Sequence, residues 1–537
     1  MTGFARSWPT EAVDVLVIGG GITGAATAYE AASRGLRVAL VERGDVGGAT
    51  SAATGKLIHG GLRYLKNLEV GLVRESLAER RTLLRIAPHL VRPIGMVLPE
   101  PGLVEHVGLT AYDLLSADRN RLPDRAGHIP RHRSLSATAL RERGLGHIDR
   151  GILYYDAMMS SPERLTLAFA EAAAAAGAHI ATYTRAETLL VRGGRVRGAR
   201  VRDAVTGEVG EIVARVTVDA TGPWLRELLA RTPELAALAG PTPHVRSEGI
   251  YLVTRRLTDT MVLTVSAHGH FSVAPWRDRS LIGPTETPYT GEVDAWRLTR
   301  GAIERFVGEI NAGARLPETL TLDDVTAAYG GLRPLGDGAG DDTYRASRAS
   351  GLHDHAADGA PGLVSALGGK YTTSRAFAQR IVDRLERTHG LFSAPSATAR
   401  TPLPGGDILD ITAAGAALRA RAAAAGVAAD TADILLAHYG TRADDVLALM
   451  ATDPRLAVRA TSDGEPLATV AYAVQHEAPE HLVDVLMRRT GIGLVGDPGD
   501  AVLDLAADLM AEARGWDAAR RRTERDAAAA AVRLPED

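Results

Sequence analysis

The first forty residues contain two short apolar runs separated by a glycine-rich turn and a helical stretch. Residues Val13–Ile18 (VDVLVI) form an apolar run of the kind that a buried parallel strand requires. Three glycines follow, then a helical pattern over Ile22–Ser33 and a second apolar run over Val38–Val41. This order predicts one βαβ unit at the start of the chain.

The rest of the chain alternates between strand-like and helical stretches up to about residue 400. Helical spacing of apolar residues runs from 70 to 86, an alanine-rich helix is predicted over 165–176, and 240–322 is strand-rich and then helical. Further short strands are predicted over 187–191, 196–202, 212–219, 325–331 and 363–369. After residues 403–406 (LPGG) the chain is alanine-rich and poor in strands, which predicts a helical domain.

Composition narrows the class of protein. A chain of 537 residues is too long for one ordinary core, and we expect two to four domains at roughly 100–200 residues each. Hydrophobic residues make up 45% and charged residues 23%, as in soluble globular proteins. The formal net charge of −4 provides no global positive field for nucleic acid, so an anionic ligand needs a local Arg or Lys cluster.

Two absences from the sequence narrow the chemistry. The chain has no cysteine, which excludes disulfides, thiolate metal ligands and a thiol nucleophile, and we predict no metal site. The first residues show no basic stretch followed by an apolar core, and no run of about 18 apolar residues occurs. We therefore expect neither a signal peptide nor a membrane-spanning helix.

The glycine-rich turn carries the pattern Gly19-x-Gly21-x-x-Gly24 between the first strand and the first helix. The first glycine permits the tight turn, the second lets the backbone approach a pyrophosphate, and the third lets the helix pack on the strand. The pyrophosphate then lies at the helix N-terminus, and Glu42, at the end of the next strand, can accept hydrogen bonds from a ribose diol. The motif predicts a bound dinucleotide and does not separate FAD from NAD.

Two later features favour FAD. A loop of small residues at 47–51 (GGATS) would let a long cofactor extend past the sheet edge. Residues 219–222 (DATG) resemble the second contact segment of flavoproteins related to glutathione reductase. An NAD dehydrogenase would normally close its Rossmann domain within the first half of the chain, whereas this chain returns to sheet strands near Val325 and Leu363.

Four longer motifs point to one family. They are 56–65 (KLIHGGLRYL), 220–224 (ATGPW), 331–335 (GLRPL) and 368–373 (GGKYTT). Together they resemble the bacterial FAD-dependent glycerol-3-phosphate dehydrogenase family, and the resemblance extends into the helical tail. It implies oxidation of sn-glycerol 3-phosphate to dihydroxyacetone phosphate by hydride transfer to FAD, with electrons passed to quinone or another acceptor.

The expected fold class is α/β. We predict a Rossmann-type, glutathione-reductase-like FAD-binding domain, an interleaved β-rich substrate domain and a C-terminal all-α domain. The FAD-binding domain is assigned to 10–85, 150–240 and 325–398. The substrate domain is assigned to 86–149 with 241–324, and the helical domain to 399–537.

The resemblance also implies site residues. Expected cofactor contacts are Gly19, Gly21, Gly24, Glu42, Thr50, Ser51, Lys56, Leu57, His59, Thr221, Gly222, Gly369 and Lys370. Substrate binding is expected from Arg63, Tyr64, Arg333 and Thr373, and catalysis from Arg63, Arg333, Lys370 and His270. Guanidinium groups suit a phosphate dianion, and a fixed positive donor suits a developing ketone oxygen.

One departure from the family concerns the base for the substrate hydroxyl. Aerobic members typically carry a histidine where this chain has Gly249. His268 and His270 lie close to a segment that resembles the flavin-facing strand, and His270 is the candidate kept. Gly283-Pro284-Thr285 and Ser160-Ser161 also differ from the usual family residues, which indicates a side branch.

Several alternatives stay open at this stage. The chain could oxidise a different polyol phosphate, or bind flavin without this turnover. An amine or amino-acid oxidase and an NAD-dependent dehydrogenase are weaker alternatives, because neither requires the motifs at 56–65 and 331–335. The expected partners are a small phosphorylated polyol and an electron acceptor, with no nucleic acid. We expect a cytoplasmic location; the sequence leaves open a homodimer and peripheral contact with the inner face of the cell membrane.

Overall fold

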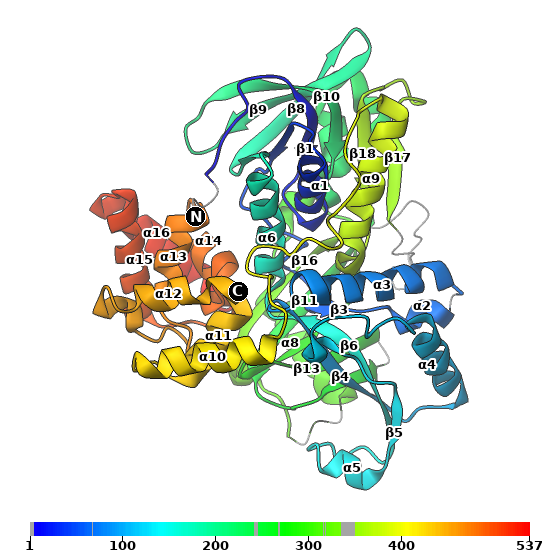
Figure 1. Cartoon of the computed structure of the whole chain (residues 1–537), viewed down its shortest axis with the longest axis vertical. Helices are drawn as coiled ribbons and strands as arrows, with labels where there is room; N and C mark the ends of the chain where they lie inside the picture. The colour runs from blue at the N-terminus through cyan, green and yellow to red at the C-terminus, as the bar shows by residue number, and fades with distance from the viewer. Residues whose placement is uncertain are drawn as a thin grey trace.

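The computed structural model describes residues 5–66, 68–240, 245–266, 269–314, 316, 318–334 and 350–536. Two β-sheets and a group of C-terminal helices make up this part of the chain (Figure 1). One sheet lies at the top of the view, the second lies below it, and the C-terminal helices lie at the left. The predicted α/β fold class with a C-terminal helical domain is confirmed.

The first sheet has eight strands and a parallel core. Its order is β17-β18-β10-β1-β2-β7, and β8 and β9 extend β10 as an antiparallel meander. The strands are β1 (Val13–Ile18), β2 (Val38–Val41), β7 (His179–Ala181), β8 (Thr184–Arg192), β9 (Arg195–Asp203), β10 (Val209–Asp219), β17 (Gly351–Asp354) and β18 (Leu363–Leu367). β1 pairs in parallel with both β2 and β10, so their carboxyl ends meet at one edge. Ligands of open parallel sheets bind at this edge.

Alternating side chains of β1 enter two different cores, as the pleat of a strand requires. Val15 and Val17 pack with α1 (Ile22–Ser33), α6 (Pro162–Ala175) and α9 (Ser374–His389). Leu16 and Ile18 pack on the other side with the meander and α7 (Leu225–Arg231). Burial on both faces explains the continuous apolar run of β1.

The second sheet has ten strands in the order β15-β11-β14-β13-β12-β4-β6-β3, with β16 beside β11 and β5 beside β6. The strands are β3 (Leu57–Ile58), β4 (Val91–Pro99), β5 (Arg133–Leu135), β6 (Gly151–Met159), β11 (Arg246–Arg255), β12 (Met261–Ser266), β13 (Gly269–Trp276), β14 (Arg279–Gly283), β15 (Thr287–Tyr289) and β16 (Val325–Arg333). Its helices are α2 (Leu62–Lys66), α3 (Val70–Ile86), α4 (Leu103–Leu115), α5 (Ala137–Arg141) and α8 (Arg300–Gly313). The helix predicted over 70–86 is confirmed.

The predicted domain boundaries are wrong for three strands. β3, β6 and β16 were assigned to the FAD-binding domain, but all three pair within the second sheet. β6 pairs with β4 along its whole length, and β16 pairs with β11 from Val325 to Arg333. Their short apolar sequences resemble parallel strands of the first sheet, and only the pairing partners separate the two assignments.

The C-terminal region is helical throughout its described length apart from short connections. Its helices are α10 (Ile411–Ala424), α11 (Ala429–Tyr439), α12 (Ala443–Leu449), α13 (Ala468–His476), α14 (Leu482–Asp484), α15 (Asp500–Arg514) and α16 (Ala518–Val532). They share a core of their own. No helix in the described part of the chain has both the length and the apolar character that crossing a bilayer requires.

A buried ion pair fastens the C-terminal helices to the rest of the molecule. Arg164 on α6 donates to the Glu477 carboxylate (Nη2 to Oε1, 2.8 Å) and to the carbonyl of His438 (2.7 Å). Glu477 is fully buried and Arg164 nearly so. Removing one partner of such a pair typically costs about 3–5 kcal/mol, because the other charge stays buried and uncompensated.

Candidate active site

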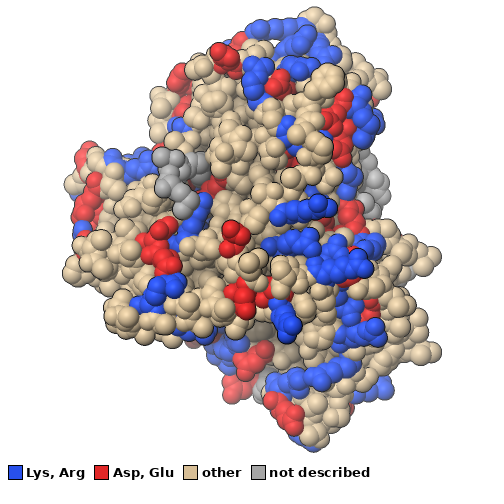
Figure 2. Space-filling view, in the orientation of Figure 1, with Lys and Arg blue, Asp and Glu red and all other residues tan. Residues whose placement is uncertain are grey.

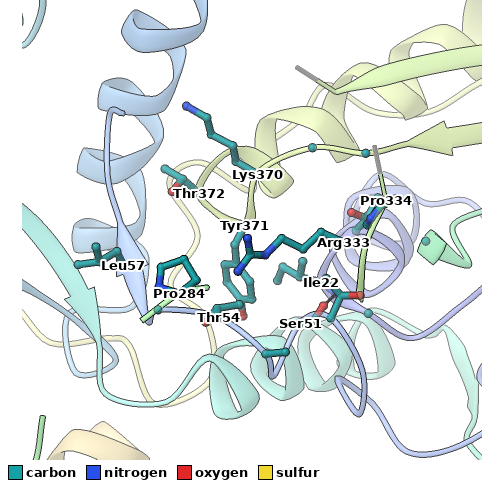
Figure 3. Close-up of a pocket in the computed structure, with 18 of the residues that line it drawn as sticks. Ile22, Ser51, Thr54, Leu57, Pro284, Arg333, Pro334, Lys370, Tyr371 and Thr372 are labelled. Atoms are coloured by element: carbon teal, nitrogen blue, oxygen red, sulfur yellow. Dashed lines mark hydrogen bonds between the residues drawn. The ribbon is translucent and has the colours of Figure 1, made fainter. Parts of the chain in front are cut away.

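One cavity is lined by residues of both sheets. Its volume is about 1610 Å³, well above the roughly 300–1,000 Å³ of common small-molecule sites. The lining comes from the turn after β1, the loop after β2, β11, the ends of β10 and β16, and segment 368–372. Figure 3 shows part of it, with Ser51 on one side, Leu57 on the other and Arg333 between them. The cavity can hold a dinucleotide together with a small substrate.

The glycine motif brings three backbone segments into direct contact. Gly19 has a φ of +107°, and a Cβ there would lie 2.6 Å from the carbonyl oxygen of Ala220. A Cβ on Gly24 would lie 1.8 Å from the carbonyl oxygen of Gly19. β1, α1 and the end of β10 can therefore meet only where side chains are absent. Gly21 and Ile22 line the cavity, so the N-terminus of α1 opens into it, and the N–H of Ile22 donates to the Ser51 hydroxyl there (2.9 Å). The positive end of the helix dipole suits an anion at this place.

Glu42 lies at the end of β2 and also lines the cavity. Its carboxylate accepts hydrogen bonds from the backbone N–H groups of Gly20 (2.6 Å) and Gly44 (2.9 Å). Burial raises the pKa of the Glu42 carboxyl, although both hydrogen bonds oppose the shift. The two bonds fix the carboxylate beside the glycine turn, where its remaining lone pairs can accept hydroxyl groups.

The C-terminal helices hold the loop that follows β2. Asp45 accepts hydrogen bonds from Arg488 (Nε to Oδ2, 2.6 Å) and from Arg489 (Nη1 to Oδ2, 2.6 Å; Nη2 to Oδ1, 2.7 Å). Burial by itself would raise the pKa of the Asp45 carboxyl, but the two positive charges outweigh it and lower the pKa to about 2. Arg488 lines the cavity, so the C-terminal domain forms part of the site. No role was predicted for Asp45, because its partners lie more than 400 residues away.

The end of β10 carries a buried carboxyl group. Asp219 accepts hydrogen bonds from the backbone N–H of Thr221 (3.0 Å) and from its hydroxyl (2.6 Å). These bonds shape the turn that brings Thr221 and Gly222 to the cavity. Burial raises the pKa of Asp219 to about 7, against the opposing effect of both hydrogen bonds.

Arg333 extends into the cavity from the last residue of β16 (Figure 3). Its guanidinium donates to the hydroxyl of Tyr251 on the neighbouring strand β11 (3.2 Å). A Cβ built on Gly249 would lie 1.9 Å from Nη2 of Arg333. The guanidinium therefore fills the space that any side chain at position 249 would need.

Lys370 and Tyr64 lie together on the cavity lining. The ammonium nitrogen of Lys370 is 3.7 Å from the centre of the Tyr64 ring and donates to the hydroxyl of Ser76 on α3 (3.2 Å). In Figure 3 this ammonium points away from Arg333. The two predicted cationic residues thus lie in the same cavity and point in different directions.

Further predicted residues also lie on the cavity lining. They are Thr50, Ser51, Leu57, His59, Thr221, Gly222, His270 and Gly369. The hydroxyl of Thr50 donates to the carbonyl of Leu332 (2.7 Å), which ties the small-residue loop to β16. His270 is exposed on β13 and has access to solvent.

Lys56 does not reach the cavity with its side chain, so its predicted cofactor contact needs correction. The side chain is fully buried, and its ammonium lies 3.5 Å from the Glu163 carboxylate. It also lies over the rings of Trp276 (4.6 Å) and Tyr329 (5.2 Å). Burial lowers the pKa of Lys56, against the opposing charge of Glu163. We assign Lys56 a structural role beneath the loop.

Thr373 is also absent from the cavity lining. Its side chain is buried, and its hydroxyl contacts the carbonyl of Lys370 (3.4 Å). Thr372 lines the cavity instead and accepts the backbone N–H of His59 (3.3 Å). Thr372, and not the predicted Thr373, therefore faces the cavity. The side chain of Arg63 and the whole of His268 lie outside the described residues.

Asp156 is a cavity-lining acid that sequence reasoning missed. Its carboxylate pairs with Arg80 and accepts hydrogen bonds from the hydroxyl of Tyr112 (2.8 Å) and the N–H of Gly60 (3.4 Å). Burial raises its pKa, against the opposing charge of Arg80. The signal in the sequence was one acid within the otherwise uncharged strand β6. The cluster fixes the loop that precedes Tyr64.

Comparison with known proteins places the chain in a family. The profile of the FAD-dependent oxidoreductases matches residues 14–375, and that of the C-terminal domain of alpha-glycerophosphate oxidase matches residues 396–521. Glycerol-3-phosphate dehydrogenase 2 of Mycobacterium tuberculosis (strain ATCC 25618 / H37Rv) is 36% identical, covering 95% of this chain and 86% of the relative. The aerobic glycerol-3-phosphate dehydrogenase of Escherichia coli K12 is 34% identical, covering 74% and 78% respectively.

A solved structure agrees with this placement. The glycerol-3-phosphate dehydrogenase of Bacillus halodurans, complexed with FAD, matches with a TM-score of 0.74 at 25% identity, covering 97% of this chain and 95% of that chain. The protein is thus one of the FAD-dependent oxidoreductases. Within that class, the chain belongs to the glycerol-3-phosphate dehydrogenase family.

The residues of the cavity fit FAD. The glycine turn leaves a cradle that side chains would fill, since a Cβ on Gly21 would lie 3.1 Å from Oγ of Ser51. The N-terminus of α1 would hold the pyrophosphate, and Glu42 would hold the adenosine ribose. The predicted FAD cofactor is confirmed by the family and by this cradle.

We expect Asp219→Asn to flatten the pH dependence of thermal stability. The pKa of the Asp219 carboxyl is about 7 in the folded protein, whereas its ordinary value is 3.8. Between these two pH values the native protein therefore keeps a proton on Asp219 that the unfolded chain has lost. This contribution to stability is fully present below about pH 3.8 and is lost as the pH rises through about 7. With FAD in excess, the Tm of the native protein should fall more between about pH 5.5 and 8.5 than that of the variant.

Asp203→Asn is the matched control. Asp203 also ends a strand and accepts backbone N–H groups, from Val205 (2.7 Å) and Thr206 (3.0 Å), but its pKa is lowered. This variant should keep the pH dependence of the native protein. Equal slopes for Asp219→Asn and the native protein would show that Asp219 does not titrate in this range.

Proposed function

We propose that the chain oxidises sn-glycerol 3-phosphate to dihydroxyacetone phosphate. The observation that supports this most directly is the position of Arg333, whose permanent charge enters the same cavity as the glycine turn. An arginine fork suits bidentate binding of a phosphate dianion. The named activity of the relatives agrees with this substrate.

The chain's own residues bind and orient the substrate. Arg333 holds the phosphate, and the family resemblance gives Arg63 as the expected second cation. Lys370 provides a positive donor for the oxygen that becomes the ketone. Bound FAD would supply the acceptor for the hydride that leaves the carbinol carbon. The proton of the hydroxyl leaves separately, and His270, exposed on the cavity lining, can pass it to solvent.

Gly249 distinguishes this site from relatives with a histidine at the corresponding position. Position 249 offers no proton acceptor, and the guanidinium that fills the space has donor groups only. We infer that Gly249 is present to let Arg333 reach Tyr251 and the substrate phosphate. The proton acceptor then has to come from another element of the site.

An anaerobic titration of the FAD-loaded protein with sn-glycerol 3-phosphate tests the function. Prompt bleaching of the flavin absorbance at stoichiometric substrate is the expected result, since the chain supplies both the phosphate clamp and the hydride acceptor. If dithionite reduces the flavin and glycerol 3-phosphate does not, the substrate is wrong. Other polyol phosphates, the alternative left open by the sequence, would then be titrated in the same way.

Gly249→Ala should raise KM for glycerol 3-phosphate by roughly tenfold or more, because the new Cβ displaces the Arg333 guanidinium. In an Arg333→Ala background the same substitution should have little effect, since the clashing group is gone. Flavin content should stay unchanged in all three variants. Steady-state kinetics with a soluble acceptor measures the double-mutant cycle.

Gly351→Ala is the control for this cycle, because a Cβ there meets Leu367 at an ordinary 3.4 Å. It should leave KM unchanged. Additive effects of Gly249→Ala and Arg333→Ala would disprove the coupling between the two positions. Loss of flavin from Arg333→Ala with an unchanged KM would instead show that Arg333 serves the cofactor.

We further propose that the rim of the cavity rests on a lipid surface, from which a quinone acceptor enters. Large apolar side chains are exposed there: Leu68, Val70, Leu103, Val104, Val107 and Leu114. Of these, Leu68, Val70, Val104 and Val107 also line the cavity. Figure 2 shows a largely uncharged surface where α4 lies, next to Lys and Arg side chains over α3. Exposed apolar groups beside cations favour binding of this surface to a membrane that contains anionic lipids.

Replacing Leu103 and Leu114 by Glu should abolish co-flotation with phosphatidylglycerol vesicles, because two charges then face the lipid. These side chains are 79% and 72% exposed and lie off the cavity lining. Turnover with a soluble acceptor should therefore remain unchanged. Val205→Glu, at an apolar residue that is 49% exposed in the turn between β9 and β10, is the control and should not affect flotation. Equal flotation of all proteins would rule out this surface.

A further inference from the structure

Two histidines and an aspartate converge at the edge of the first sheet, away from the cavity lining. His353 lies on β17, His355 follows the strand, and Asp358 lies in the turn before β18. Residues two apart on an extended chain point to the same side. Both rings therefore face the carboxylate.

The three side chains present their ligand atoms to one point. Nε2 of His353 lies 2.5 Å from Oδ2 of Asp358, and Nδ1 of His355 lies 3.0 Å from the same oxygen. The three ligand atoms lie within 4.8 Å of one another. In a tetrahedral zinc site with bonds of about 2.0–2.2 Å, ligand atoms are about 3.3–3.6 Å apart. Side-chain shifts of about an ångström would therefore open the cluster around an ion.

One ring is already oriented by an outer partner. Nε2 of His355 lies 2.8 Å from the hydroxyl of Ser365 on β18, which holds the ring with Nδ1 toward Asp358. Metal-binding histidines almost always use their second nitrogen in this way. His355 is buried, whereas His353 and Asp358 are partly exposed, so an ion has a route from solvent and room for water ligands.

Backbone hydrogen bonds close the turn between β17 and β18 without the side chains of His353, His355 and Asp358. The backbone N–H of His355 donates to the carbonyl of Leu363 (3.1 Å), and that of Ala360 donates to the carbonyl of His355 (2.9 Å). The side chain of Asp354 accepts the N–H of Ala356 (3.1 Å) and pairs with His389 (3.2 Å), which supports the turn from another direction. Asp358 is thus left facing two imidazoles.

We propose that His353, His355 and Asp358 bind a divalent transition-metal ion, with Zn²⁺ as the best match. Two imidazole nitrogens and one carboxylate oxygen suit zinc, nickel or cobalt and disfavour magnesium and calcium, which take oxygen ligands. The ion would join the end of β17 to the turn that leads into β18. β18 continues directly into Gly368, Gly369 and Lys370 of the cavity, so the ion supports the strand that carries them.

The test is zinc titration of the chelator-treated, FAD-loaded protein by isothermal calorimetry. The native protein should bind one Zn²⁺ per chain, and millimolar Mg²⁺ should not compete. His353→Gln and Asp358→Asn should each weaken the affinity tenfold or more, because each removes one ligand. Both residues are partly exposed, so the variants should keep their flavin absorbance, which confirms that they are folded.

Asp354→Asn is the matched control, since Asp354 lies on the same strand and pairs with His389 instead. It should bind zinc as the native protein does. Absence of saturable zinc binding to the native protein would overturn the proposal. So would unchanged binding in His353→Gln and Asp358→Asn, because the ion would then occupy other ligands.

Discussion

Backbone contact at the carboxyl end of β1 is the constraint on which the site depends. A side chain at Gly19 would meet the carbonyl of Ala220, and one at Gly24 would meet the carbonyl of Gly19. Because both positions lack a Cβ, the start of α1 can pack against the end of β1 and the end of β10. The N–H groups at the start of α1 and the carboxylate of Glu42 then face one space. A dinucleotide-binding edge follows from this packing.

Buried charges extend that edge to the rest of the molecule. Asp45 joins the loop after β2 to Arg488 and Arg489, and Arg164 joins α6 to Glu477. Apart from the partly exposed Arg488, these charges are buried, and all are paired. Removing one partner of such a pair is therefore costly. The C-terminal helices therefore help to shape the cofactor end of the cavity.

At the substrate end of the cavity, the position of the Arg333 side chain depends on the absence of a side chain at Gly249. The Arg333 guanidinium occupies the volume beside Gly249 and reaches Tyr251. A side chain at position 249 would displace the guanidinium from this position, because its Cβ would lie 1.9 Å from Nη2 of Arg333. The absence of a side chain at position 249 therefore permits the observed placement of the Arg333 guanidinium.

The βαβ unit, the glycine turn, Glu42, the family and the all-helical C-terminus could be predicted from the sequence, because they depend on local periodicity and on contiguous motifs. The sheet to which β3, β6 and β16 belong could not, since strands of similar composition differ in their pairing partners alone. The tertiary structure also turned Lys56 and Thr373 away from the cavity and brought Asp156 to it. Side-chain direction and contacts between residues hundreds of positions apart depend on packing, which no local pattern records.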